Sequence, residues 1–392
     1  MMIIELIVKI LLIGLSLPVA YLLLSTVAAY LFKKERSGEN RFLNIGVVIP
    51  AHNEEMGIVS TIEGVLACDY PANRLEIFVI ADNCDDATAE KARTAGAVVF
   101  ERSDTFNRGK GQALDWFLNT GHEAYRHSDA IAIIDADVTP DKNFLREISA
   151  SFSNPFVQVL QAYNGVSNPK SGWRPALIDA AFNIFNHLRM AGSVRLSGTS
   201  VLKGNGMAFR TTILERYGWP CHSIVEDMEF TLRLLEDNIT VHYNPDAIIR
   251  SEMVTSAKSA SSQRSRWEGG RFMLIRKMTL PLLMKFAKTG DSKYLFALAE
   301  LATPPLSLLV LLCSIATAGA FLVLNGAWTL LAASFWAIMA FYVISGQIQR
   351  RAELSTWLYL AMAPLYVFWK IPLYLAMLLK KKTPAWIRTT RE

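Results

Sequence analysis

Apolar residues are distributed unevenly along this chain, and their pattern divides it into three parts. Long, mostly uncharged runs lie at 10–31 and from about 295 to 379. About 20 consecutive apolar residues suffice for a helix to cross a bilayer. Between these runs, over 44–244, short apolar segments alternate with stretches of helical periodicity. The pattern predicts a folded domain flanked by membrane-embedded segments.

The central part contains short, continuously apolar runs separated by helical patterns. The runs cover 46–50, 76–80, 97–100 and 130–134, and the helical patterns lie near 54–67, 86–95 and 108–120. Continuous apolar strands that alternate with helices indicate an α/β domain with a mostly parallel sheet covered on both faces. Such sheets bind ligands beyond the carboxyl ends of their strands. We therefore expect functional residues directly after each strand.

The N-terminal run predicts a transmembrane helix over residues 1–32. Lys33, Lys34 and Arg36 follow it at once, which by the positive-inside tendency places the central domain in the cytoplasm. A cleavable signal peptide is the alternative, but its apolar core has only about 7–15 residues and precedes a small-residue cleavage site. The run here is longer, so we expect an integral protein of the inner (cytoplasmic) membrane.

The C-terminal part predicts several membrane elements. Mixed apolar and basic residues over 271–292 favour interfacial helices, broken near Pro281. The runs 301–324 and 327–344, separated by a short turn, predict a hairpin of two spans within a membrane region over 295–379.

The last apolar run, 357–379, contains Lys370 between two prolines. If it spanned the membrane, the basic tail 380–392 would lie outside, against the positive-inside tendency. A broken, partly re-entrant arrangement is favoured over a full crossing.

Composition supports a membrane protein and gives little sign of nucleic-acid binding. Of 392 residues, 52% are hydrophobic, above the roughly 45–50% of soluble domains. The net charge is only +5, and basic clusters at the membrane ends suit contact with anionic lipids. The four cysteines (Cys68, Cys84, Cys221 and Cys313) form no C-x-x-C pair, which argues against a zinc or disulfide framework and fits a reducing cytoplasm.

Asp135 and Asp137 end the strand predicted at 130–134 and lie two residues apart, so both can face one side. Their oxygens can converge on a hard cation such as Mg²⁺ or Mn²⁺, which would stabilise a diphosphate leaving group. The alternative is an acidic turn in which Asp137 or Thr139 caps the following helix.

Two further motifs follow downstream. Glu226 and Asp227 open a helical pattern, where a carboxylate can take a proton or simply complement a helix N-terminus. Gln263, Arg266 and Trp267 fall on one side of a helix at their spacing. Arg266 can pair with a diphosphate, and Trp267 offers a flat face for a sugar or acceptor. A basic interfacial helix with a Trp anchor is the alternative.

In this order, the motifs resemble those of the membrane-integrated family-2 glycosyltransferases, such as cellulose, chitin and hyaluronan synthases and ceramide glucosyltransferase. The resemblance runs from about Gly46 to Arg271 and implies a GT-A-type nucleotide-sugar-binding domain over 44–270. It implies that Asp227 is the general base of an inverting transfer, with Glu226 beside it. Val225 departs from the threonine usual before this pair.

The resemblance also implies a UDP-sugar donor. The segment with Pro50, Asn53 and Glu54 would lie along the uridine, and Asp82 would contact the base. Asn83-Cys84 replaces the commoner Asp-Gly, which leaves the geometry of this loop open. Asp85 and Asp86 are interpreted as first-turn acids of the next helix.

Glycine-rich segments complete the predicted site. Lys110, within Arg108-Gly109-Lys110-Gly111, would contact the donor phosphates, unless this is an ordinary helix-entry loop. Gly204, Asn205 and Gly206 would let an acceptor lie close to the backbone, together with Trp267; a simple β-turn is the alternative. His52 and His187 are interpreted as structural. Arg264, Arg271 and Arg276 are assigned to headgroups or solvent.

The leading hypothesis is an inverting transfer from a UDP-sugar to a polysaccharide or lipid-linked saccharide, in cell-surface polysaccharide synthesis with Mn²⁺ or Mg²⁺ as cofactor. Membrane lipids and polysaccharide-assembly proteins are the expected partners. A membrane-lipid acceptor, such as a ceramide or diacylglycerol, is the alternative. A non-catalytic subunit that only binds a nucleotide sugar is a further alternative, but binding alone would not require a general base. A membrane phosphotransferase is another, but it would leave Trp267 and Glu226-Asp227 without a role.

Overall fold

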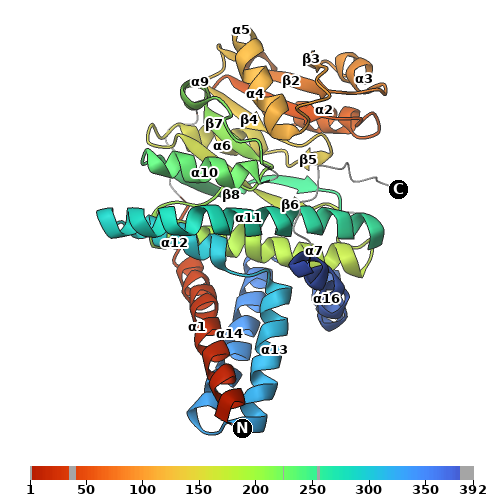
Figure 1. Ribbon diagram of the computed structural model, residues 1–392. Helices are drawn as coiled ribbons and strands as arrows, with labels where there is room; N and C mark the ends of the chain where they lie inside the picture. Colours follow the sequence, from red (N-terminus) through yellow and green to blue (C-terminus); the bar gives the residue numbers. More distant parts are fainter. Residues whose placement is uncertain (1, 35–40, 224, 254–256, 380–392) are drawn as a thin grey trace.

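The computed structural model has an α/β domain at one end and a bundle of long helices at the other, with two helices lying crosswise between them (Figure 1). It describes residues 2–34, 41–223, 225–253 and 257–379, with the side chains of 257–268, 373 and 375–379 excepted. The chain begins at the far end of the bundle, away from the domain.

The described part of the domain forms an eight-stranded sheet in the order β3-β2-β1-β4-β7-β6-β8-β5. The strands are β1 Ile45–Ala51, β2 Leu75–Asp82, β3 Val98–Arg102, β4 Ala130–Ile133, β5 Val138–Pro140, β6 Val159–Val166, β7 Met207–Arg210 and β8 Val241–Ser251. β1 pairs in parallel with β2 and β4, β2 with β3, and β6 with β8. β7 runs antiparallel between β4 and β6, and β5 is antiparallel to β8. The predicted mostly parallel sheet is confirmed.

Helices cover both faces of this sheet. They are α2 Ile58–Leu66, a 3₁₀ turn Ala72–Arg74, α3 Thr88–Thr94, α4 Lys110–Thr120, α5 His122–Tyr125, α6 Phe144–Phe152, α7 Trp173–Phe182, a π-helix Asn183–Leu188, α8 Arg189–Ser197, α9 Thr211–Tyr217 and α10 Glu226–Glu236. In β1, Val47 packs with α2 and α6 while Val48 packs with α4 and α10. Burial on both faces explains why the strands are continuously apolar.

The predicted helices begin later than the sequence pattern suggested. Residues 54–57, 86–87 and 108–109 precede the helices as loops. Gly109, before α4, has φ +131°, a backbone conformation that glycine tolerates and that does not belong to a helix. These loops follow β1, β2 and β3. The residues predicted to be helical but found in loops therefore lie at the carboxyl ends of the strands, where parallel sheets bind ligands.

In the part of the chain that the structure describes, three helices are long and apolar enough to cross a membrane: α1 Met2–Tyr30, α13 Leu306–Val323 and α14 Ala327–Gln349. They pack against one another, and a Cβ at Gly319 of α13 would lie 2.8 Å from a methyl group of Val8 in α1. The predicted hairpin turn is present, with Gly326 at φ +58°. Its first span begins only at Leu306, because α12 ends just before Pro304 and Pro305.

The crosswise layer consists of α11 Ala257–Thr289 and α12 Ser292–Ala302 (Figure 1). The predicted break near Pro281 is wrong, because α11 runs through this residue. Leu274 and Leu282, on either side of the proline, are both buried with Leu235 of α10 and Tyr294 of α12. This shared packing on both sides holds the helix together across the hydrogen bond that proline removes.

The last apolar run is divided into α15 Leu354–Tyr359, a 3₁₀ turn Leu360–Met362 and α16 Ala363–Leu379. α16 contacts α13 and α11. The break lies at Leu360–Met362, whereas α16 runs through Lys370 and Pro372. A re-entrant path through the membrane stays a prediction. The predicted basic tail 380–392 lies outside the described residues.

Candidate active site

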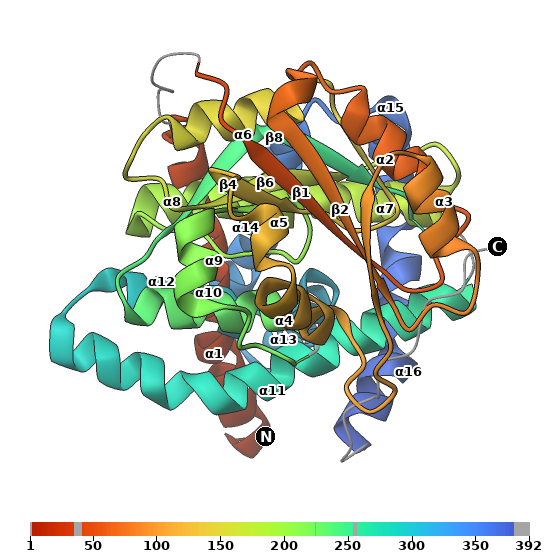
Figure 2. The ribbon, with the colours of Figure 1, turned by 90° about the horizontal axis from the view of Figure 1, so that it is seen from above.

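A cleft of about 560 Å³ opens at the carboxyl ends of β1, β2 and β4, the edge where parallel sheets bind ligands. Seen from above, α4, α10 and α11 lie on the same side of this edge (Figure 2). The predicted site residues that line the cleft are Pro50, Glu54, Asp82, Lys110, Asp135, Asp137, Gly204, Asn205, Glu226 and Asp227. Asn53 and Gly206 are not among the residues that line it. The side chains of Gln263, Arg266 and Trp267 lie outside the described part of the structure.

Asp82 is held by an ion pair at the end of β2. Its Oδ1 accepts from Nη1 of Arg102 at 2.6 Å, and both side chains are nearly buried. The two residues are directly opposite each other in the parallel register of β2 and β3. Sequence reasoning missed Arg102 because the predicted third strand ended at residue 100. If the third strand had been predicted to end two residues later, at Arg102, its pairing with Asp82 could have been predicted.

The loop after β2 keeps its shape with Asn83 in place of the commoner aspartate. Asn83 has φ +51°, a left-handed conformation that asparagine tolerates better than most residues. Its amide donates to Asp82 Oδ1 at 2.8 Å, and its Oδ1 accepts from the backbone N–H of Asp104 at 2.8 Å. The departure from the family pattern therefore gives an ordered loop joined to the segment after β3.

The loop after β1 is fastened to the loop after β2. Asn53 exchanges hydrogen bonds with Asp85, whose backbone N–H donates to Asn53 Oδ1 at 2.9 Å. Asp85 and Asp86 both precede α3, so neither is the first-turn acid that the sequence suggested. Asp86 still supports the start of the helix, because its Oδ1 accepts from Thr88 N–H at 2.9 Å. His52, interpreted as structural, lines the cleft with Nδ1 2.7 Å from the carbonyl oxygen of Asp82.

Lys110, the first residue of α4, joins two of the predicted motifs. Its Nζ lies 2.5 Å from Asp135 Oδ1 and also donates to the carbonyl oxygen of Gly204. Burial alone would lower the pKa of Lys110, but the carboxylates of Asp135 and Glu226 outweigh it, so the pKa is raised. Lys110 is therefore a fixed cation in the centre of the cleft. The next residue, Gly111, lets α4 pack closely against the backbone at Cys221, since a Cβ at Gly111 would lie 2.4 Å from the carbonyl oxygen of Cys221.

Asn205 is nearly buried and supports Asp135. Its Oδ1 accepts from Asp135 N–H at 3.1 Å, and its amide donates to Ser251 Oγ at 3.2 Å. Gly204 has φ +76°, and a Cβ there would lie 3.3 Å from Asp227 Oδ2. The glycine segment thus brings its backbone beside Asp227.

Glu226 and Asp227 form the first turn of α10, with Asp227 Oδ1 accepting from Met228 N–H at 2.8 Å. Desolvation in the cleft, followed by the neighbouring Asp227 charge, raises the pKa of Glu226 to about 8. Desolvation also raises the pKa of Asp227, against the opposing effect of Lys203 and Lys110. A proton held by Glu226 at neutral pH removes a negative neighbour, which favours the ionised, basic form of Asp227.

Asp135 and Asp137 fit a divalent cation that shares its ligands with a substrate. Both line the cleft, while the described residues contain no cluster of three or more His, Cys, Asp or Glu that would enclose a metal. Mg²⁺ characteristically binds through one or two carboxylates and completes its shell with water and phosphate oxygens. The donor set therefore suits a cation that arrives with a diphosphate.

The membrane-facing end of the cleft contains residues that sequence reasoning did not assign to the site: Phe182, Phe185, Asn186, Lys203, Ser251, Glu252, Met253 and Arg271. The assignment of Arg271 to headgroups or solvent is wrong, because it donates to the backbone carbonyl oxygens of Glu300 and Leu301. His187 is buried between Tyr243 and Gln349. Burial lowers the pKa of His187 to about 3, so it is neutral and structural as predicted.

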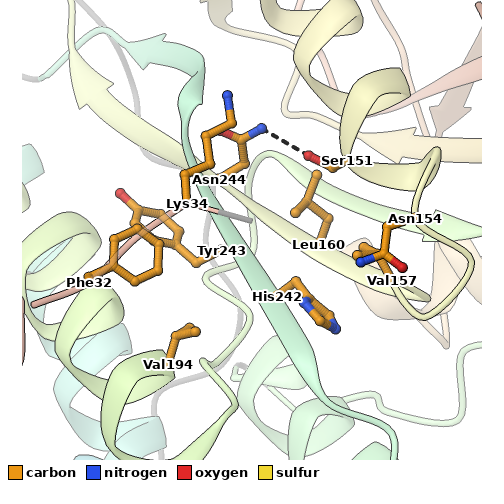
Figure 3. Close-up of a pocket in the computed structure, with 10 residues that line it drawn as sticks. All are labelled: Phe32, Lys34, Ser151, Asn154, Val157, Leu160, Val194, His242, Tyr243 and Asn244. Carbon is orange, nitrogen blue, oxygen red and sulfur yellow. Dashed lines mark hydrogen bonds between the residues drawn. The ribbon is translucent and has the colours of Figure 1, made fainter. Parts of the chain in front are cut away.

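A second, much smaller cavity lies behind the sheet. It measures about 30 Å³ and is lined by residues such as Lys34, Tyr243 and Asn244 (Figure 3). The side-chain amide of Asn244 donates a hydrogen bond to Ser151 Oγ, which also lines this cavity, at 2.9 Å. This volume is enough for a water molecule or two and is too small for a nucleotide sugar.

The mostly parallel sheet, with its cleft at the carboxyl ends of the strands, has the arrangement of a GT-A-type domain. The family model "Glycosyltransferase like family 2" matches residues 43–270, more than half of the chain. The chain belongs to this family, and the resemblance drawn from its motifs is confirmed.

Curated relatives share this domain at modest identity. A probable glycosyltransferase, YdaM of Bacillus subtilis, is 28% identical over 68% of this chain and 63% of its own length. The β-monoglucosyldiacylglycerol synthase of Trichormus variabilis is 28% identical over 66% and 56%. Glucomannan 4-β-mannosyltransferase 7 of Arabidopsis thaliana is 29% identical over 59% and 43%. This chain therefore spans about half to two thirds of the length of these relatives.

A solved structure matches nearly the whole chain. The mannosyltransferase PcManGT of Pyrobaculum calidifontis, in complex with GDP-Man and Mn²⁺, aligns with a TM-score of 0.56 at 17% identity. The alignment covers 93% of this chain and 99% of PcManGT. At this identity the match establishes a shared fold, which extends beyond the sheet into the helical part.

Proposed function

We propose that this protein is an inverting glycosyltransferase that moves a sugar from a UDP-sugar to an acceptor hydroxyl at a membrane. The observation that carries the proposal is the meeting of Asp135, Asp137, Lys110 and Asp227 in one cleft. Lys110 contacts both the carboxylate motif and the glycine segment beside Asp227. A binding subunit would require the first three groups but not a carboxylate poised to take a proton.

In the proposed step, Asp227 takes the proton of the acceptor hydroxyl while its oxygen forms a bond to the anomeric carbon. The bond from that carbon to the diphosphate breaks on the opposite face, and the nucleoside diphosphate leaves with the electron pair. A Mn²⁺ or Mg²⁺ ion at Asp135 and Asp137 would neutralise the charge of the leaving group. Lys110 binds the phosphates as a point charge. Glu226, protonated at neutral pH, keeps a second negative charge away from Asp227.

The acceptor is proposed to be a growing polysaccharide or a lipid-linked saccharide, with a cytoplasmic cleft at the inner membrane. The crosswise helices α11 and α12 lie between the domain and the candidate spans, which supports a cleft that opens next to the bilayer. A simple membrane lipid is the second candidate. Phe182 and Phe185, which are partly buried and line the cleft, favour it because they offer an apolar wall.

The decisive experiment presents the purified membrane protein with UDP- and GDP-sugars, Mn²⁺ or Mg²⁺, and native lipid extract. We expect nucleoside diphosphate release with a UDP-sugar only when an acceptor is present, and a product whose mass contains one or many added sugars. Mass analysis separates a glycolipid from a polymer. Nucleotide-sugar binding without acceptor-dependent release in any combination would contradict the proposal and favour a binding subunit.

A further inference from the structure

A buried cluster of charges lies where the cleft meets the crosswise helices. At its centre is Glu300 of α12, whose side chain is 6% exposed. Arg189 of α8 contacts Glu300 Oε2 at 2.5 Å, and Lys203 Nζ contacts Oε1 at 3.1 Å. Tyr21 of α1 donates to Oε2 at 3.0 Å. One carboxylate therefore joins a candidate membrane helix, the π-helix–α8 unit and the wall of the cleft.

Lys203 is the member of this cluster that also belongs to the cleft. Its side chain is 17% exposed, and it lines the cavity that holds Asp227. Its backbone N–H donates to Gln161 Oε1 at 2.9 Å, which fixes its position ahead of Gly204. The next residue, Gly204, is the one whose added Cβ would lie 3.3 Å from Asp227 Oδ2. Lys203 is thus paired with Glu300 and lines the same cleft as Asp227.

Among the described residues, Lys110 is a second cation near Asp227. Lys110 is paired with Asp135 and with the carbonyl oxygen of Gly204. Within the described part of the chain, the charges of Lys203 and Lys110 oppose the rise in the pKa of Asp227, and the charge of Asp135 contributes to the rise in the pKa of Glu226. Three carboxylates in a desolvated cleft disfavour one another's ionised forms, so a base there needs a positive neighbour.

We propose, on the basis of the transfer reaction proposed above, that Lys203 is a positioning residue whose ammonium, anchored by Glu300 from the membrane side, keeps Asp227 ready to take the acceptor proton. Glu300 has a second part in this arrangement. Burial, together with the charges of Arg189 and Arg271, lowers the pKa of Lys203, and the carboxylate of Glu300 opposes that lowering. The membrane-side helices thereby contribute to the chemistry without contacting the substrate.

The test compares Lys203→Met, Lys203→Arg and a matched control, Lys34→Met. Lys203→Met leaves Glu300 paired with Arg189, so the cluster keeps its main ion pair. Lys34 is also a partly buried lysine with two carboxylate partners, Glu147 and Asp246, but it lines the small cavity of Figure 3. Initial rates are measured from pH 5.5 to 9 at saturating donor, together with KM for the UDP-sugar and the melting temperature.

For Lys203→Met we expect kcat at pH 7 to fall about tenfold, a fraction of the full contribution of a general base. The donor KM should stay near its wild-type value. The acid limb of the pH–rate profile should move to higher pH, because Asp227 holds its proton longer without a positive neighbour. In Lys203→Arg the acid limb should return to its wild-type pH. Lys34→Met should change neither the rate nor the position of the acid limb.

Two results would overturn the proposal. One is a Lys203→Met rate and profile equal to those of Lys34→Met. The other is a loss of rate that is the same at every pH, since that indicates packing alone. Asp227→Asn separates this inference from the proposed function: an inactive Asp227→Asn with a normal Lys203→Met rejects only the role of Lys203, whereas an active Asp227→Asn rejects the assigned base.

Discussion

The two ends of the cleft are built in different ways. At the donor end, each functional side chain follows a strand, and its partner comes from the neighbouring strand or loop, as Asp82 and Arg102 do. At the membrane-facing end, Lys203 and Arg189 depend on Glu300, which lies 97 and 111 residues away in the chain. The end of the cleft that we propose binds the donor is therefore a property of the sheet, whereas the proposed acceptor end exists only when domain and membrane-side helices are packed together.

This difference implies that damage at each end should have a distinct signature. Changes among the sheet-borne residues should affect donor binding and the chemical step with little dependence on the lipid environment. Changes in the Glu300 cluster should alter catalysis through the packing of helices. The following predictions test that division.

The largest effect is expected for Asp227→Asn. Without a group that takes the acceptor proton, kcat should fall about 10³-fold, within the range that general bases contribute. Metal-dependent binding of the UDP-sugar, measured by calorimetry, should survive because Asp135, Asp137 and Lys110 are intact. Near-normal turnover in this variant would show that another group acts as the base.

A smaller loss, about 10²-fold, is expected for Asp137→Asn. This change removes one of two carboxylates available to a divalent cation, and metal ions contribute several kcal/mol to charge stabilisation at such sites. The metal concentration for half-maximal rate should rise, and excess Mn²⁺ should partly restore activity. An unchanged metal dependence would remove Asp137 from the metal site.

Gly111→Ala tests how closely the donor end is packed. The added Cβ would approach the carbonyl oxygen of Cys221 to 2.4 Å, so α4 must shift and carry Lys110 with it. Overpacking of this kind costs about 1–3 kcal/mol. Gly14→Ala is the control, since nothing lies within 4 Å of its added Cβ. Thermal unfolding in detergent should show a lower melting temperature for the first variant only.

The smallest effect concerns pH and stability. The pKa of Glu226 is about 8 in the folded protein, above its ordinary value of about 4.3. Its contribution to stability is therefore complete below pH 4 and is lost as pH rises through 8. The glutamine in Glu226→Gln does not ionise. The melting temperature of this variant, relative to that of the wild type, should therefore rise between pH 6 and pH 9. A constant difference across this interval would mean that Glu226 is ionised throughout.

The sequence predicted the donor end better than the acceptor end for physical reasons. Strands buried on both faces leave continuous apolar runs, and the loop residues that follow them are adjacent in the chain, so Asp82, Asp135 and Lys110 could be placed together. Arg102 was missed by only two residues of strand length. Lys203 and Arg271 could not be found in this way, because both contact Glu300, which is distant in the sequence. Glu300 lies in a helix whose orientation no local sequence pattern specifies.

The membrane part shows the same limit. Hydropathy located α1 and the α13–α14 hairpin, since each is a self-contained apolar run. It gave a wrong break at Pro281, because the packing of Leu274 and Leu282 on one common surface overrides the local effect of proline. The local pattern specifies where a helix can form, and tertiary contacts decide where it continues.

The unbroken α11 has a mechanical consequence. Its 33 residues make a rod about 50 Å long, at 1.5 Å per residue. Tilting such a rod by one degree about one end displaces the other by about 0.9 Å, comparable to the 1 Å misplacement that can cost a reaction about 10²-fold. Bilayer thickness and composition are therefore variables that rate measurements on this protein need to hold constant.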